Sequence, residues 1–138
     1  MDSRRPEVLI VEDEPLVALN LEGLVEELGY AVTGALPDAA SAWEHAVRSA
    51  PDIAIVDLNL LDGRTGLTLA GRLASELGVT VIVATGNPGD VPEDGPVFDV
   101  VRKPYMDEVM AQALQRALCA TREPTCPQSI CSQAADGA

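Results

Sequence analysis

Residues Ile53 to Asn59, Ile-Ala-Ile-Val-Asp-Leu-Asn, are the stretch from which the rest of the chain can be interpreted. The run is apolar and largely β-branched, does not alternate with polar residues, and follows the turn-forming pair Pro51-Asp52. Such a short run is typical of a strand that is buried on both faces, as in a parallel sheet. Asp57 stands where this strand ends, and open α/β sheets bind their ligands at that end. Taken alone, Asp57 is either the tip of an ordinary strand or the start of a site.

Apolar runs of this kind alternate with helical patterns along almost the whole chain. The runs predict five strands, at 8–11, 30–33, 52–57, 79–84 and 97–101. Between and after them, apolar residues spaced three and four apart predict helices at 15–28, 38–50, 67–77 and 106–119. Right-handed crossovers then place helices on both faces of a doubly wound, five-stranded parallel sheet. We expect the flavodoxin-like strand order 2-1-3-4-5 for this α/β fold.

One connection breaks the alternation. Residues 87–96 read Asn-Pro-Gly-Asp-Val-Pro-Glu-Asp-Gly-Pro, which is too rich in proline and glycine for a full helix. At most one turn is expected there, between Gly89 and Glu93. The sequence therefore predicts that the fourth helix of the fold is shortened or missing.

Composition limits the classes of function. The 138 residues suit one domain, and the net charge of −13 with a pI near 4.2 argues against binding to nucleic acid or an anionic membrane. No run approaches the roughly 18 apolar residues of a membrane span. The apolar run at 8–11 is also shorter than the roughly 7–15 residues that the core of a signal peptide needs. We therefore expect a cytoplasmic protein.

The domain is expected to span residues 7–120, after an N-terminal extension at 1–6. From 121 to 138 the sequence lacks periodicity, which predicts a disordered tail. The three cysteines, Cys119, Cys126 and Cys131, have the spacing of neither a disulfide framework nor a zinc site. We expect them to be reduced.

Polar and charged side chains that could form a site follow four of the five predicted strands. The carboxyl ends of parallel strands share one edge of the sheet. The side chains expected there are Glu12 and Asp13 from the first strand, Asp57 from the third, Thr85 from the fourth and Lys103 from the fifth. Three carboxylates at one edge repel one another unless a cation lies between them. Mg²⁺ prefers carboxylates, a carbonyl, water and phosphate oxygens. The sequence therefore predicts a Mg²⁺ site formed by these acids, with the backbone carbonyl of Asn59 as an additional ligand.

Each of these signals also has a plain structural interpretation. An acidic pair before Pro15 is typical of a helix start, where it complements the helix dipole. Thr85-Gly86 is typical of a turn, and a lysine before Pro104 is usually exposed. Their joint occurrence at four strand ends favours a site.

The chain resembles the receiver domains of two-component response regulators. The resemblance rests on Val-Leu-Ile-Val-Glu-Asp-Glu-Pro at 8–15, Ile-Val-Asp-Leu-Asn-Leu at 55–60, Ala-Thr-Gly at 84–86 and Lys-Pro at 103–104. It implies a CheY-like fold in which Asp57 accepts a phosphoryl group from a phosphohistidine of a sensor histidine kinase or histidine phosphotransfer protein.

The resemblance also implies the role of each site residue. Asp13, Asp57 and the Asn59 carbonyl hold Mg²⁺, and Glu12 acts through water. Lys103 pairs with the phosphoryl oxygens, and the Thr85 hydroxyl turns toward them.

Two positions depart from the pattern of the family. Many receivers place an aromatic residue three positions before the lysine, where this chain has Val100. The Ala84-Thr85-Gly86 sequence resembles an alphaproteobacterial subclass with a Phe-Ala-Thr-Gly signature, although Val83 replaces its phenylalanine.

The expected function is that of a single-domain, Mg²⁺-dependent switch or phosphate shuttle, with a homodimer as one output. It is not an enzyme beyond its own phosphorylation and dephosphorylation. One alternative is a receiver-like binding module that works without phosphorylation. Another is an aspartyl-phosphate hydrolase, which is disfavoured because Asn59 occupies the place of its second acid.

Overall fold

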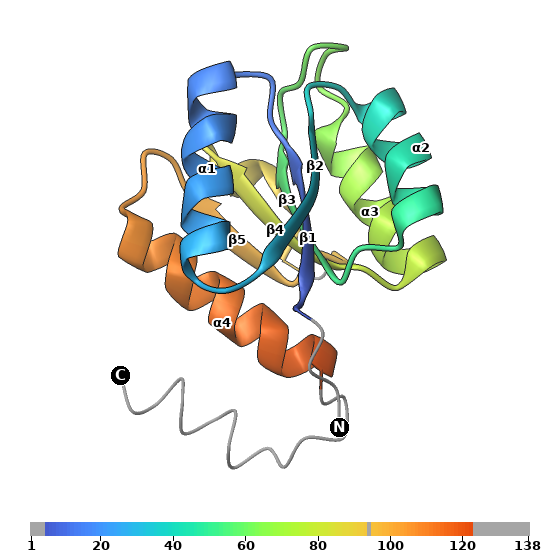
Figure 1. The fold of residues 1–138 in the computed structure, drawn as a ribbon. Helices are drawn as coiled ribbons and strands as arrows, with labels where there is room; N and C mark the ends of the chain where they lie inside the picture. The colour runs from blue at the N-terminus through green and yellow to red at the C-terminus, as the bar shows by residue number, and fades with distance from the viewer. Residues whose placement is uncertain (1–4, 94, 123–138) are drawn as a thin grey trace.

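The computed structural model describes residues 5–93 and 95–122. Ten elements follow one another along the chain (Figure 1). They are β1 (Glu7–Val11), α1 (Pro15–Glu27), β2 (Ala31–Leu36), α2 (Ala39–Ser49), β3 (Ile53–Asp57), α3 (Gly66–Leu77), β4 (Thr80–Thr85), the 3₁₀ helix η1 (Pro88–Asp90), β5 (Asp99–Arg102) and α4 (Asp107–Arg122).

The five strands form one parallel sheet in the order β2-β1-β3-β4-β5. Helices α1 and α4 cover one face of the sheet, and α2 and α3 cover the other (Figure 1). The predicted doubly wound sheet and its strand order are therefore confirmed.

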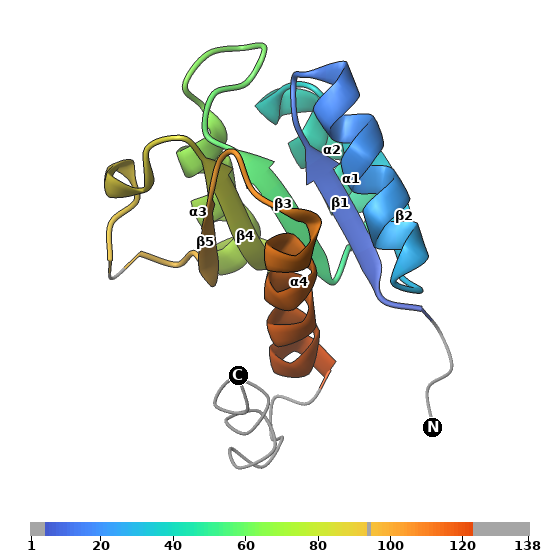
Figure 2. The ribbon, with the colours of Figure 1, turned by 90° about the vertical axis from the view of Figure 1, so that its left-hand side faces the viewer.

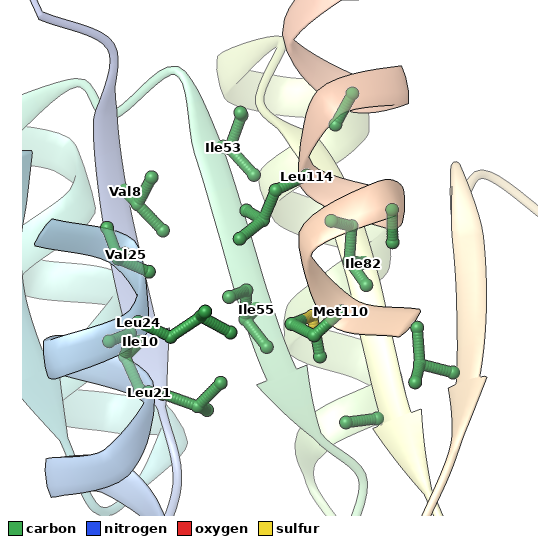
Figure 3. Packing of buried hydrophobic residues seen from close by; sticks show 14 of the residues in the cluster. Val8, Ile10, Leu21, Leu24, Val25, Ile53, Ile55, Ile82, Met110 and Leu114 are labelled. Atoms are coloured by element: carbon green, nitrogen blue, oxygen red, sulfur yellow. The ribbon is translucent and has the colours of Figure 1, made fainter. Parts of the chain in front are cut away.

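Each face of the sheet has its own core, because successive strand residues point to opposite sides. On one face, Ile10, Ile55 and Ile82 pack under α1 and α4, whose contributions include Leu24 and Met110 (Figure 3). On the other face, Val56 lies with residues of α2 and α3. Fully burying one such side chain contributes about 1.5–3 kcal/mol. The two cores therefore hold the central strands, and hence their carboxyl ends, in fixed positions.

Local signals set the ends of the helices. Pro15 occupies the first turn of α1, where its missing N–H costs no hydrogen bond. The Asp38 carboxylate caps α2 by accepting from the Ser41 N–H at 2.7 Å. Helix α3 ends at Gly78, which has a φ of 69°, and the sequence predicted the same helix end.

Among the described residues between β4 and β5, the 3₁₀ turn η1 is the only helical element, in agreement with the predicted loss of a full fourth helix. The turn begins at Pro88, just before the window between Gly89 and Glu93 in which it was expected. Val91 and Val97 pack into the core on the α2 and α3 face. The segment thus covers part of the sheet without forming a helix.

The last helix differs from the prediction at its C-terminal end. Helix α4 continues to Arg122, and so enters the segment 121–138 that was predicted to be disordered. Cys119 is disulfide-bonded, so the expectation of a reduced thiol is wrong for this residue. Cys126, Cys131 and the predicted tail beyond Arg122 lie outside the described residues. Within the described ranges, no helix is long and apolar enough to span a membrane.

Candidate functional site

Strand register brings the predicted acids together at the carboxyl edge of the sheet. Val11 pairs with Val56, so the residues that follow them, Glu12 and Asp57, leave neighbouring strands at the same level. Carboxylate oxygens of Glu12, Asp13 and Asp57 all lie within 4.8 Å of one another. Residues separated by more than forty positions in the sequence therefore form one acidic cluster.

Lys103, which follows the edge strand β5, forms hydrogen bonds to two of these acids. Its Nζ donates to Glu12 Oε1 and to Asp57 Oδ2, each at 2.9 Å. The side chains of Glu12 and Asp57 are only 2% and 11% exposed, and that of Lys103 is 24% exposed. Because charges buried to this degree are costly unless paired, the lysine stabilises both carboxylates in place.

The pKa values of the bridged groups move for opposing reasons. Burial raises the pKa of Glu12, and the hydrogen bond from Lys103 counteracts only part of that effect. Burial alone would lower the pKa of Lys103, but its hydrogen bonds to Asp57 and Glu12 outweigh burial and leave the pKa raised. Lys103 therefore stays charged across the physiological range.

Backbone N–H groups orient the other carboxylate oxygens. Glu12 Oε2 accepts from the Glu14 N–H at 3.1 Å, and Asp57 Oδ1 accepts from the Asn59 N–H at 3.2 Å. The three carboxylates offer only oxygen atoms as metal ligands, and two of the three residues are buried. Such a set suits a hard cation such as Mg²⁺. The Asn59 carbonyl remains a predicted ligand.

Thr85 ends β4 beside this cluster and is 2% exposed. Its Oγ1 accepts a hydrogen bond from the Asn87 N–H at 3.0 Å, so the hydroxyl closes the turn that begins the β4–β5 connection. The Thr85 carbonyl accepts from the Lys103 N–H at 2.8 Å. Thr85 therefore links the lysine strand to the remodelled connection. The Lys103–Pro104 peptide bond is cis.

The departure at Val100 changes what lies beside the lysine. Val100 is partly buried against the core on the α2 and α3 face. Tyr105 is half-buried on the other face, where burial raises its pKa to about 12. Tyr105 and Lys103 also line a groove of about 450 Å³ together with residues of α1.

Gly66 is a site residue that sequence reasoning missed. A Cβ at this position would lie 2.0 Å from the Asp57 carbonyl oxygen and 2.6 Å from Leu58 Cα. Only glycine allows the first turn of α3 to approach the strand end so closely. The glycine before Leu67 was the available signal, but glycine is common in loops and does not by itself indicate close packing.

An open parallel sheet whose carboxyl edge gathers three acids and a lysine defines an α/β protein with a rim suited to a cation and an anionic group. The chain belongs to the response regulator receiver domain family of two-component systems, whose model matches residues 8–115.

Several known proteins share this domain. The chain is 36% identical over 118 residues to the phyllosphere-induced regulator PhyR of Methylorubrum extorquens, a match that covers 81% of this chain and 43% of that protein. The solution structure of the PhyR receiver domain of Erythrobacter litoralis is 30% identical, with a TM-score of 0.74, and the match covers 83% of this chain and 91% of that one. The anti-anti-sigma factor PhyR of Bartonella quintana matches at 27% identity and a TM-score of 0.75, over 83% of this chain and 48% of that one. The chain spans about half the length of the curated relatives it matches.

Proposed function

We propose that Asp57 is a Mg²⁺-dependent phosphoryl acceptor that receives its phosphoryl group from a phosphohistidine of a sensor kinase or phosphotransfer protein. One observation carries the proposal: Lys103 binds the Asp57 carboxylate at 2.9 Å beside the three-acid cluster. Phosphoryl transfer depends mainly on positioning and on neutralising charge, and this rim supplies groups for both.

The reaction joins an Asp57 oxygen to phosphorus while the bond from phosphorus to the donor imidazole nitrogen breaks. The leaving imidazole keeps the electron pair of that bond. Asp13, Asp57 and the Asn59 carbonyl would hold a Mg²⁺ ion, with Glu12 acting through water, and the bound ion would supply charge neutralisation at the transferred oxygens. Lys103 needs to move only from carboxylate to phosphoryl oxygens to do the same from the other side.

The product changes the charge at the rim. A phosphoryl group adds about −1.5 to −2 charges and three strong acceptor oxygens. The two groups placed to follow these oxygens are Lys103 and the Thr85 hydroxyl, which now binds the Asn87 N–H. We infer that phosphorylation is read out as a changed β4–β5 connection, which alters the binding of a partner protein. The anti-anti-sigma activity of the Bartonella quintana relative is a precedent for such an output.

The experiment that tests this function is phosphotransfer profiling against phosphorylated histidine kinases, with and without Mg²⁺. The proteins compared are wild type, Asp57→Ala and a control, Glu44→Gln, which alters an exposed carboxylate on α2. We expect wild type and the control to be labelled only with Mg²⁺, and the signal of Asp57→Ala to fall by at least about 100-fold, because the nucleophile is lost. Intact mass spectrometry measures the labelling. Equal labelling of Asp57→Ala would place the acceptor elsewhere.

A further inference from the structure

The connection from β3 to α3 begins directly after Asp57 and is closed by its own backbone. Leu60 and Gly63 exchange two hydrogen bonds, Leu60 N–H to the Gly63 carbonyl at 2.8 Å and the reverse at 2.9 Å. Gly63 has a φ of 107°, a conformation that favours glycine. The Gly66 N–H donates to the Leu58 carbonyl at 3.0 Å. The segment is therefore a small, defined loop and not a loose link.

Asp62 lies at the tip of this loop and fastens it to a different part of the chain. Its carboxylate accepts from the Ala39 N–H at 3.1 Å and from the Ala40 N–H at 3.4 Å, both in the first turn of α2. The Thr65 hydroxyl donates to Asp62 Oδ1 at 2.7 Å and fixes the carboxylate from within the loop. The neighbouring Leu61 N–H donates to the Pro37 carbonyl at 2.9 Å.

The first turn of α2 thus receives two carboxylates with different origins. Asp38, its own cap residue, accepts from the Ser41 N–H, while Asp62 reaches the Ala39 and Ala40 N–H groups from the loop after Asp57. The N–H groups of a first helical turn lack partners within the helix, so each carboxylate satisfies donors that would otherwise need water. The hydroxyl of Thr65 and the N–H of Ala39 also lower the pKa of Asp62, so the carboxylate is ionised at neutral pH.

We propose that Asp62 is a positioning residue, whose bonds to the start of α2 hold the Asp57–Asn59 segment in the geometry that binds a divalent cation. The proposal rests on the proposed function of the Asp57 site. Asp57 and Asn59 lie between a buried strand and the loop that Asp62 anchors, and the Asn59 N–H already binds Asp57 Oδ1. Without the Asp62 bonds, the bond from the Leu61 N–H to the Pro37 carbonyl still ties the loop to the residues before α2, but the Asn59 carbonyl, the predicted ligand, is held less firmly beside the three acids.

The same contacts make the coupling reciprocal. If the Asp62 bonds favour the cation-binding geometry, cation binding must strengthen the Asp62 bonds by an equal free energy. Mg²⁺ is therefore expected to slow hydrogen exchange of the Ala39 and Ala40 amides, although they belong to another element than the site. This effect is independent of phosphotransfer activity.

The test compares Asp62→Ala with Asp38→Ala, since both remove a carboxylate from the same helical turn but only Asp62 belongs to the loop. We expect Asp62→Ala to raise the Kd for Mg²⁺ by about fivefold, because Asp62 contacts no metal ligand itself and acts only through hydrogen bonds that hold the loop. The Kd of Asp38→Ala is expected to stay within about twofold of wild type, although that variant is less stable because it loses its helix cap. NMR titration with Mg²⁺ alone measures both, and hydrogen exchange at Ala39 and Ala40 with and without Mg²⁺ is the second measurement.

A second variant acts from the other side of the contact. Ala39→Pro removes one donor to Asp62 at the first helical position, where proline is tolerated, and is expected to raise the Kd in the same direction. An unchanged Kd in Asp62→Ala, or an equal rise in Asp38→Ala, would overturn the inference and leave the proposed function intact. Wild type that binds no Mg²⁺ would overturn both, whereas failure of Asp57 labelling in a protein that binds Mg²⁺ would overturn the proposed function alone.

Discussion

Two connections leave the carboxyl edge of the sheet beside the site (Figure 2). They differ in how firmly hydrogen bonds hold them. The β3–α3 connection, residues 58–65, bonds to itself and is anchored to α2 through Asp62. Among its described residues, the β4–β5 connection at 86–98 has one 3₁₀ turn and one buried side chain, Val91. Its backbone N–H groups donate from Asp90 to Asn87, from Val91 to Pro88, from Gly95 to Pro92 and from Phe98 to Val81 of β4.

This difference suggests separate roles: the first connection holds site residues in position, and the second changes conformation in response to the site. The first connection follows Asp57 and contains Asn59, whose geometry must be in place before a phosphoryl group arrives in the function we propose. The second follows Thr85, whose hydroxyl would follow that group. Segments with few buried contacts open at low free energy and are the ones that move in switches. We therefore expect the first connection to hold its shape and the second to change.

The sharpest test of this comparison uses Gly66, which follows the first connection at the start of α3, and a glycine of the second connection. In Gly66→Ala the new Cβ meets the backbone of Asp57 and Leu58, which cannot move aside as a flexible side chain could. We expect a loss of about 2–3 kcal/mol or more in the free energy of unfolding, measured by urea denaturation.

The matched control is Gly89→Ala in η1, where a Cβ would meet no atom within 4 Å. We expect this variant to lie between no change and a gain of about 1 kcal/mol, because alanine reduces the entropy of the unfolded chain. Similar losses in both variants would show that the two connections are equally constrained.

An intermediate effect is expected at Thr85, where the second connection meets the site. Thr85→Val keeps the shape of the side chain but removes the acceptor of the Asn87 N–H. We expect the Asn87 amide to exchange about fivefold faster in this variant, because the lost hydrogen bond contributes about 1 kcal/mol. Hydrogen exchange resolved at Asn87 makes the measurement.

Phosphorylation should then alter exchange at Asn87 in wild type and in Thr85→Ser, which keeps the hydroxyl, but not in Thr85→Val. Exchange at Gly63 should be the same in all three proteins. A phosphorylation response that persists in Thr85→Val would remove Thr85 from the link between the site and the connection.

Sequence reasoning was strongest where the signal is local. The apolar runs predicted all five strands, and parallel topology brought Glu12 and Asp57 to one edge. The Pro- and Gly-rich stretch predicted the lost fourth helix. Each of these predictions depends on backbone preferences and burial, which a short segment expresses by itself.

Individual side-chain contacts between distant segments could not be predicted from the sequence. The Asp62 carboxylate meets α2 across 23 positions, and nothing in its neighbours indicates that partner. Lys103 was expected at the same edge as Glu12 and Asp57, but its bridge between the two carboxylates was not predicted, and its pairing with a phosphoryl group stays a prediction. The disulfide at Cys119 was missed because cysteine spacing alone does not show which thiols meet.

The smallest expected effect concerns an ion pair between the two connections, which Arg64 and Asp90 form at 3.1 Å. Both side chains are well exposed, at 75% and 44%, so water screens their attraction. We expect Arg64→Ala to change the free energy of unfolding by less than about 1 kcal/mol, and any difference from wild type to shrink in high salt.

Arg72→Ala is a useful comparison, because Arg72 combines an exposed ion pair to Glu76 with a position 3.8 Å over the Trp43 ring. Its loss should exceed that of Arg64→Ala, since stacking on an aromatic face adds about 0.5–1 kcal/mol at exposed sites. Urea denaturation at low and high salt measures both variants. If Arg64→Ala instead costs more than about 2 kcal/mol, the second connection is tied to the first, and the division between a fixed and a responsive connection fails.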